Sequence, residues 1–441
     1  MTDTKTRRRP PAITRRSAIA AIAGSLASLA GCGGGGTPIA GISSGGTGSF
    51  TTGTVTGLGS IIVNGIRWDD SQAQRVRRDG QADDGSALQI GRVVDIVGSR
   101  ATPAAVAGAR PTATATMIRW GAEWVGPIDT GSRSATGFTI LGHPVDVTAT
   151  TIVDGAVTRL ADLADGDVVE VDGHLDLSVQ PARLLATRIE RATQQPSVWR
   201  VSGTVRTRTP AADPASGTFS LGGDLIAYGP STEVPSAWGV GTVVGVRLDT
   251  TGPTPYAALR VIERLAPSRE LGVEDDEEAE IEGRITAWNG AASFAVNGVP
   301  VDASTAGHLP AGLGIGVRVE VEGRLVDGVV RAQSVTLHQE DTYRDEGFEL
   351  HGTVNSLDSS AKTFLLQRAR GQTIPVRFDA QTVFDPPGTT LADGQAVELK
   401  VRRLDGQWKA TQIEVESADE DGGLDEDSDN DNDNDNGDGD G

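Results

Sequence analysis

Apolar and polar residues alternate along much of the chain between residues 53 and 417. The clearest stretch is 317–322, where Val317, Val319 and Val321 share one face while an arginine and two glutamates share the other. Alternation with a period of two is typical of a β-strand with one apolar face. No window in this region keeps a helical period for long. The pattern therefore predicts an all-β fold.

A first landmark recurs five times: a glycine in a predicted strand, followed two places later by an apolar residue. Successive glycines lie 73, 77, 80 and 69 residues apart, which indicates tandem modules of similar length. The five pairs are Gly53 with Val55, Gly126 with Ile128, Gly203 with Val205, Gly283 with Ile285, and Gly352 with Val354.

Two further landmarks place the remaining strands. Asn64-Gly65 and Asn297-Gly298 lie between apolar runs, which is the strongest short-range signal for a hairpin with a type I′ turn. Later in each module an apolar residue is followed three places on by a glycine and then by a strand. These pairs are Leu88 with Gly91, Leu163 with Gly166, Trp238 with Gly241, Leu313 with Gly316, and Leu391 with Gly394.

Each module thus has a long first strand, a hairpin of strands two and three, a loop and a final pair of strands. Five short strands in such a length predict a small, partly open barrel of the OB type. The alternative is an immunoglobulin-like sandwich, which normally needs about seven strands and roughly a hundred residues. The predicted modules, numbered 1 to 5 below, are 53–124, 125–194, 197–267, 280–340 and 348–417.

Two runs of module 1 carry a family resemblance. Residues 59–69 (GSIIVNGIRWD) and 88–94 (LQIGRVV) resemble the bacterial domain-of-unknown-function family 5666, and the other modules fit the same scheme more loosely. The resemblance implies an exported protein or lipoprotein with tandem copies of one domain. It implies no activity and supplies no catalytic residues.

The first 32 residues have the form of an export signal. A basic segment that includes Arg15 and Arg16 precedes an apolar stretch, 18–30, and small residues before Cys32. The apolar stretch is too short to span a bilayer. Arg15 and Arg16 resemble a twin-arginine signal, although the bulky residue usual two places after the arginines is replaced by an alanine, and the general secretory route remains the alternative.

Cys32 is the only cysteine and ends the lipobox-like run LAGC. We expect cleavage before Cys32, palmitate and other acyl chains on it, and a flexible Gly/Ser-rich tether over 33–52. A structural thiol is disfavoured, because Cys32 has no partner for a disulfide. Gly33 stands where bacterial lipoproteins retained at the inner membrane carry an aspartate. Resemblance to that class implies a cell-envelope protein at the outer membrane, facing the periplasm or the surface.

Charge divides the chain unevenly. Its formal net charge is −21, and residues 418–441 contribute twelve acids and no base. This tail is too polar to fold alone, so we expect it to be disordered and to associate loosely with calcium at most. The rest of the chain is also acidic, which argues against nucleic acid as a partner, since binding phosphates needs clustered lysines and arginines.

Candidate chemistry is sparse. The five histidines are spread over three modules, and no phosphate-binding loop or dinucleotide fingerprint is present. One cluster near the connection between modules 4 and 5 contains His338, Glu340, Asp341 and His351, a ligand set that could hold zinc or manganese. A solvated charged linker is the plainer interpretation of the same residues.

These observations favour a non-enzymatic scaffold with no cofactor. The sequence predicts a membrane-anchored string of barrels that docks an envelope protein or polysaccharide. Recognition of a glycan or a divalent cation is the alternative from a second class. A metal-dependent enzyme built around His338 and His351 is the third.

Overall fold

The computed structural model describes residues 50–416 except 79–82, 84, 86–87, 105–108, 178, 214, 253, 265–270, 272–276, 338–346, 369–370 and 405. The predicted export signal with Arg15 and Arg16, the lipidation site Cys32, residues 33–49 of the predicted tether and the acidic tail lie outside the described residues. The last three residues predicted as tether, 50–52, are instead buried and form the start of strand β1, Phe50–Leu58. The described part consists of strands β1 to β28 and one 3-10 turn, Leu160–Asp162. None of its helical segments has the length and apolarity needed to cross a membrane.

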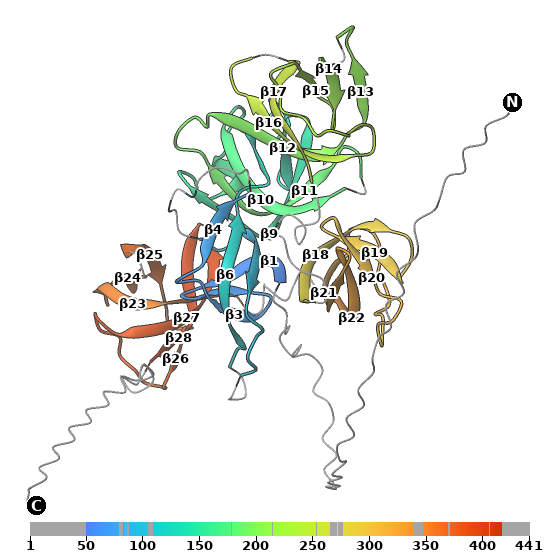
Figure 1. Cartoon of the computed structure of the whole chain (residues 1–441). Helices are drawn as coiled ribbons and strands as arrows, with labels where there is room; N and C mark the ends of the chain where they lie inside the picture. Colours follow the sequence, from blue (N-terminus) through green and yellow to red (C-terminus); the bar gives the residue numbers. More distant parts are fainter. Residues whose placement is uncertain are drawn as a thin grey trace, which may run out of the picture. The chain divides into compact units, whose positions relative to one another are not determined.

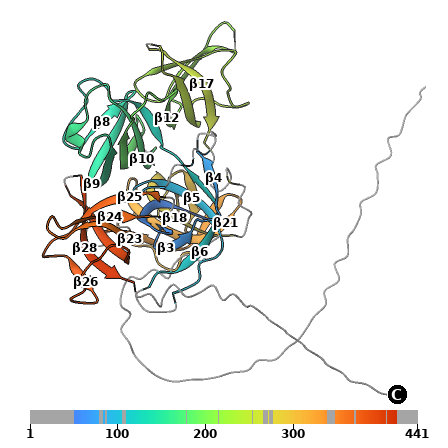
Figure 2. The same cartoon turned by 90° about the vertical axis from the view of Figure 1, so that its left-hand side faces the viewer.

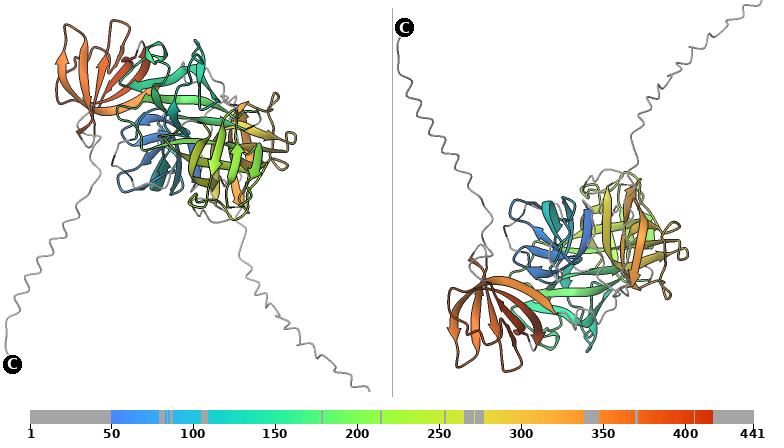
Figure 3. Two further views of the ribbon diagram at one scale, coloured as in Figure 1. Left: turned by 90° about the horizontal axis from the view of Figure 1, so that it is seen from above. Right: turned by 90° about the horizontal axis from the view of Figure 1, so that it is seen from below.

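Module 5 shows the common plan most completely (Figure 1). The first strand, β23, pairs antiparallel with β24 and β27, β24 pairs antiparallel with β25, β25 pairs parallel with β28, and β28 returns to β27. The resulting closed order, 1-2-3-5-4-1, is that of an OB barrel. These red and orange strands form a barrel in Figures 2 and 3. Their bounds are β23 Phe348–Asp358, β24 Thr363–Gln367, β25 Thr373–Arg377, β26 Val383–Asp385, β27 Ala396–Leu404 and β28 Gln407–Val415.

Modules 1 and 4 have the same strand order, including the parallel pairing of the third and last strands. In module 1 the strands are β1 Phe50–Leu58, β2 Ile61–Val63, β3 Ile66–Asp69, β4 Gln74–Arg77, β5 Val93–Gly98 and β6 Thr112–Trp120. In module 4 they are β18 Glu278–Trp288, β19 Ser293–Val296, β20 Val299–Asp302, β21 Arg318–Val326 and β22 Val329–Leu337.

Modules 2 and 3 vary this plan. In module 2 the first and second strands meet only through the isolated bridge between Ile128 and Ile140, and in module 3 the first strand is broken into β12 and β13. The strands of module 2 are β7 Trp124–Pro127, β8 Gly137–Ile140, β9 His143–Gly155, β10 Val168–Asp176 and β11 Arg183–Arg191. Those of module 3 are β12 Val198–Thr204, β13 Thr207–Pro210, β14 Gly217–Ser220, β15 Leu225–Tyr228, β16 Val243–Asp249 and β17 Tyr256–Glu263. The predicted all-β, OB-like fold is confirmed, and the sandwich alternative is wrong.

Two of the sequence landmarks, the late glycine and the apolar residue of the first landmark, are joined by a hydrogen bond. In every module the amide of the late glycine donates to the carbonyl of the apolar residue in or just after the first strand, at 2.8 to 2.9 Å. All five glycines have positive φ, between 78° and 93°, a conformation that side chains with a Cβ rarely adopt. The donor and acceptor pairs are Gly91 to Val55, Gly166 to Ile128, Gly241 to Val205, Gly316 to Ile285, and Gly394 to Val354.

The two Asn-Gly hairpins have the predicted turns. Asn64 and Gly65 have φ of 51° and 75°, and Asn297 and Gly298 have 48° and 80°, the positive values that a type I′ turn requires at both central positions. The third hairpin of this kind, in module 2, has Leu141 at φ 50° where asparagine would be expected.

The long first strand of module 1 also joins other modules. The start of β1 pairs in parallel with β18, with Phe50 opposite Ala279, and its end pairs in parallel with β23, with Gly57 opposite Glu349. Phe50 is fully buried within the apolar core of module 4. One strand therefore takes part in three barrels, and the sequence pattern, which assigns it to one, did not predict this.

Candidate functional site

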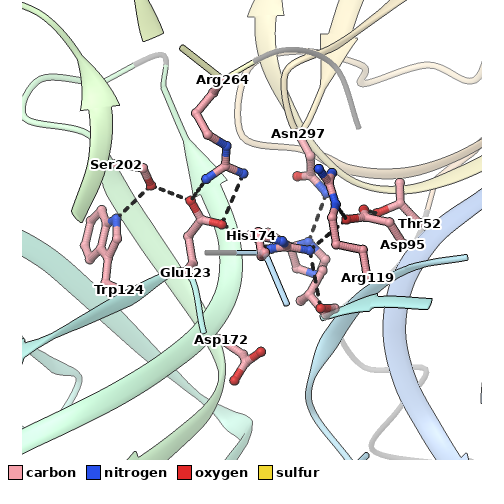
Figure 4. A network of polar contacts seen from close by, with 12 residues as sticks. Thr52, Asp95, Arg119, Glu123, Trp124, Asp172, His174, Ser202, Arg264 and Asn297 are labelled. Carbon is pink, nitrogen blue, oxygen red and sulfur yellow. Dashed lines mark hydrogen bonds and ion pairs between the residues drawn. The ribbon is translucent and has the colours of Figure 1, made fainter. Parts of the chain in front are cut away.

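A network of polar contacts lies where modules 1 to 4 meet, and we call it the polar junction (Figure 4). Asp95 on β5 is its first centre. The Asp95 carboxylate accepts hydrogen bonds from Thr52 Oγ1 at 2.7 Å, Arg119 Nε at 2.9 Å and Arg78 Nη2 at 3.0 Å. Burial by itself would raise the pKa of Asp95, but Arg119 and Arg78 outweigh it and hold the pKa at about 2.

Glu123, just before β7, is the second centre. Its carboxylate is bound by Arg264 Nη1 at 2.7 Å and Arg78 Nη1 at 3.2 Å, and it accepts the hydroxyl proton of Ser202. Ser202 in turn accepts a hydrogen bond from Trp124 Nε1 at 3.1 Å. Burial opposes ionisation, yet the two arginines lower the pKa of Glu123 to about 2. Arg78 thus bridges two buried carboxylates, one on β5 and one just before β7.

His174 on β10 links three modules. Its Nδ1 lies 3.1 Å from the amide nitrogen of Asn297, and its Nε2 lies 3.0 Å from Thr54 Oγ1. The Asn297 amide nitrogen can only donate, and its orientation is fixed because it also donates to the Glu282 carbonyl. Nδ1 of His174 is therefore the acceptor, and Nε2 carries the proton that faces Thr54. In this neutral form the His174 side chain connects its module with two others through hydrogen bonds to Asn297 and Thr54.

Arg92 and Arg188 complete the contact between modules 1 and 2. Arg92 donates to Asp172 at 3.0 Å and to Glu190 at 3.3 Å. Arg188, almost fully buried, donates to the Ile90 carbonyl at 3.2 Å and pairs with Asp154 at 3.1 Å. The sequence places these arginines and acids on polar strand faces, but it could not show that another module covers those faces.

The arrangement is built to hold modules together. Ser202 is the hydroxyl closest in form to a nucleophile beside a base, yet Glu123 is a very weak base at a pKa of about 2. Its carboxylate is also neutralised by two guanidinium groups. Such a pair cannot remove the serine proton efficiently at neutral pH.

The predicted metal cluster is only partly placed. His338, Glu340 and Asp341 lie outside the described residues. His351 lies on β23, where its ring and the carboxylates of Glu349 and Glu398 bring potential ligand atoms within 4.8 Å of one another. Sequence reasoning missed both glutamates as partners of His351, because Glu398 comes from β27 and Glu349 alternates with His351 along its own strand.

Two arginines already bind the side chains of this group. Arg67 Nη2 lies 3.0 Å from His351 Nε2 and 3.3 Å from Glu398, and Arg110 donates to both oxygens of Glu349. Burial lowers the pKa of His351, against the opposing effect of Glu398. A divalent cation would have to displace two guanidinium groups, so the donor set fits an ion-pair cluster between modules 1 and 5 better than a metal centre.

The tryptophans contribute mainly to cores. Trp68, Trp120, Trp124 and Trp408 are buried, and the other three, Trp199, Trp238 and Trp288, are partly buried. Trp238 packs edge-on against Phe219 at 5.0 Å between ring centres. The described chain therefore has no exposed tryptophan.

Comparison with other proteins gives matches to one family model but no activity. No curated protein matches the chain. Among solved structures, the chain is similar to "drosophila Unr CSD456" at 11% identity and a TM-score of 0.13, covering 51% of this chain and 99% of that one. It is also similar to a multidomain Streptococcus pneumoniae protein with nucleic acid binding domains, at 11% identity and a TM-score of 0.12, covering 49% and 73%. Scores this low carry no argument about fold or function.

The family model described as "Domain of unknown function (DUF5666)" matches residues 125–190, 282–336 and 351–414. These ranges fall within modules 2, 4 and 5. The matched ranges do not include module 1, whose sequence carries the resemblance noted above. Three segments of the chain are thus similar to the DUF5666 family.

Proposed function

We propose that this protein is a lipid-anchored scaffold of the cell envelope, in which tandem OB-like modules present a composite surface to an envelope protein or polysaccharide. The parallel pairing of β1 with both β18 and β23 carries the proposal. Independent modules on a string would not need such pairing. Modules that share strands and buried ion pairs keep their surfaces in fixed register, which a scaffold requires.

The proposed membrane location rests on the export signal in the first 32 residues. Arg15 and Arg16 would direct export, and Cys32 would carry palmitate and other acyl chains at the outer membrane, with the barrels in the periplasm or at the surface. The net charge of −21 speaks against nucleic acid as a partner. The polar junction supports a non-enzymatic role, because its acids are neutralised by arginines.

Recognition of a glycan or a divalent cation remains the alternative. Calcium would associate with the acidic tail rather than with Glu349, His351 and Glu398, whose oxygens and ring nitrogen already bind arginines. A metal-dependent enzyme at His351 is the least supported candidate for the same reason.

The test is membrane fractionation of the full chain and of Cys32→Ser in a Gram-negative host, with palmitate labelling and gentle crosslinking. We expect label and membrane association for the wild type alone, together with specific crosslinks to an envelope component. Equal behaviour of the two proteins would remove the anchor from the proposal. An anchored protein without any specific neighbour would remove the scaffold role.

A further inference from the structure

A cavity of about 880 Å³ opens beside the barrel of module 5. Its module 5 side is formed by β24, β25 and the start of β28, the red and orange strands of Figure 2, and by the turn before β28. Leu58 and Ile90 of module 1 and Asp154 and Arg188 of module 2 line it as well. This volume lies within the range of roughly 300 to 1,000 Å³ that small-molecule sites occupy.

The cavity is basic although the protein is acidic. Of its described lining residues, five are cationic and two are carboxylates, a formal charge of +3 in a chain of net charge −21. The cations are Arg188, Arg368, Arg377, Arg403 and Lys409. A concentration of positive charge within low-dielectric walls attracts anionic ligands.

Three of these cations already have acidic partners. Arg188 and Arg403 share Asp154, at 3.1 and 3.0 Å, and Lys409 pairs with Asp379 at 2.5 Å. The two carboxylates that line the cavity are therefore already paired with cations.

Arg368 and Arg377 form no such ion pair within the described chain. Arg368 Nη1 donates to the neutral side chain of Gln372 at 3.1 Å, and the Nε atoms of both arginines are buried without a hydrogen-bond acceptor among the described residues. Burial lowers the pKa of Arg368 against a smaller opposing effect of Asp70, so its charge is poorly compensated. A desolvated guanidinium that has an unpaired Nε and no ion-pair partner is costly, and a bound anion would reduce that cost.

Part of the remaining wall is apolar. Ile90 and Trp408 are nearly buried, and Val376 and Phe378 belong to the same lining as the arginines. Arg403 stacks over the Trp408 ring at 4.8 Å, which fixes that ring in place. A ligand that fits this lining carries an acidic group next to a ring or another compact, less polar body.

We propose that the cavity binds a small anionic ligand whose carboxylate or phosphate is held by Arg368 and Arg377. Guanidinium groups suit both acids, because their planar fork donates two parallel hydrogen bonds. The cavity lies on strands two and three and beside the loops that OB barrels generally use for ligands. The inference goes beyond the scaffold role and needs no lipid anchor.

Titration calorimetry on the full chain tests the proposal with four probes. Trigalacturonate carries carboxylates, glucose 6-phosphate and inorganic phosphate carry phosphate, and maltotriose is a neutral control. Binding of trigalacturonate alone would identify a sugar acid as the source of the anion, and binding of either phosphate would identify a phosphorylated ligand. We expect at least one acidic probe to bind saturably and maltotriose not to bind.

The variants Arg368→Gln and Arg377→Gln should each weaken that binding about tenfold, the loss expected for one charge-assisted contact. Arg133→Gln, which changes an exposed arginine of module 2 outside the cavity, should leave it unchanged. Thermal melting checks that each variant folds, and the Arg377 variant keeps the test valid if Arg368 cannot be replaced. The proposal is wrong if no acidic probe binds at millimolar concentration, if maltotriose binds equally well, or if both folded variants bind like the wild type.

Discussion

Gly283 of β18 lies directly against the side chain of Asn297, the first residue of the module 4 hairpin turn. A Cβ atom on Gly283 would overlap the Asn297 amide. That amide spans the glycine: its nitrogen donates to the Glu282 carbonyl at 3.1 Å, and its oxygen accepts the Arg284 amide proton at 3.2 Å. In module 1 a Cβ atom on Gly53 would likewise overlap the Asn64 amide, whose nitrogen donates to the Thr52 carbonyl at 3.1 Å. The first-strand glycine is thus needed to leave room for the side-chain amide of the hairpin asparagine.

We expect Gly283→Ala to destabilise the protein by about 2 to 3 kcal/mol, because the new methyl group displaces the Asn297 amide and breaks its two hydrogen bonds with β18. Urea unfolding followed by circular dichroism measures the change. Gly307→Ala, at a glycine of the same module with open space around its Cβ position, is the matched control and should cost under about 0.5 kcal/mol.

A double-mutant cycle makes this prediction sharper. In an Asn297→Ala background, Gly283→Ala should cost at least about 1 kcal/mol less than in the wild type, because the clash has been removed. Additive effects of the two substitutions would show that the glycine is needed for another reason.

The pair formed by Arg92 and Asp172 should contribute to stability out of proportion to its size. Both side chains are buried, and Asp172→Asn removes a carboxylate that lies closer to the guanidinium, at 3.0 Å, than Glu190 does, at 3.3 Å. We expect a loss of about 2 kcal/mol in the free energy of unfolding, as is usual when one partner of a buried pair is removed. Asp146→Asn breaks an ion pair with Arg183 of the same 3.0 Å length whose partners are roughly half exposed, and it should cost under about 0.5 kcal/mol. Equal losses in the two variants would contradict the assignment of Asp172 to the junction between modules.

Glu280 on β18 should make stability fall as pH rises. Burial, followed by the hydrogen bond to Glu320 and repulsion from Glu320, Glu322 and Glu282, raises its pKa well above the usual 4.5. Above pH 4.5 the unfolded chain has released this proton while the folded chain still holds it. Folding is then progressively penalised until the folded pKa is reached.

Glu280→Gln keeps the shape and removes the ionisation. The variant should match the wild type near pH 4 and exceed it by about 2 kcal/mol at pH 8, as measured by unfolding at both pH values. Glu233→Gln changes an exposed glutamate and should follow the wild type at both. If Glu280→Gln is less stable than the wild type at pH 8, the carboxylate is needed in its charged form.

The sequence predicted contacts within modules better than contacts between them. The Gly394 and Val354 landmarks, separated by forty residues, were recognised as a recurring pattern, and they form a hydrogen bond because glycine alone tolerates that backbone conformation. The alternation in β21 correctly separated the valines from Arg318 and Glu320, but both polar residues are buried. A polar strand face looks the same in sequence whether water or another module covers it. For this reason the pattern could not reveal the polar junction or the cavity beside module 5.

His143 on β9 should make stability fall as pH decreases. The ring is buried against Trp124, with 5.2 Å between ring centres, and burial lowers its pKa from 6.5 to about 4, against a smaller opposing effect of Asp129. Between these values the unfolded chain binds a proton that the folded chain does not. The stabilisation is therefore complete above pH 6.5 and is lost as the pH falls toward 4, by up to about 3 kcal/mol.

His143→Leu should lose correspondingly less stability than the wild type between pH 7 and pH 4.5, measured by urea unfolding at each pH. His308→Leu, at an exposed histidine of module 4, should retain the wild-type slope. A His143→Leu protein with the full wild-type slope would show that other groups cause the acid sensitivity, because leucine has no proton to gain.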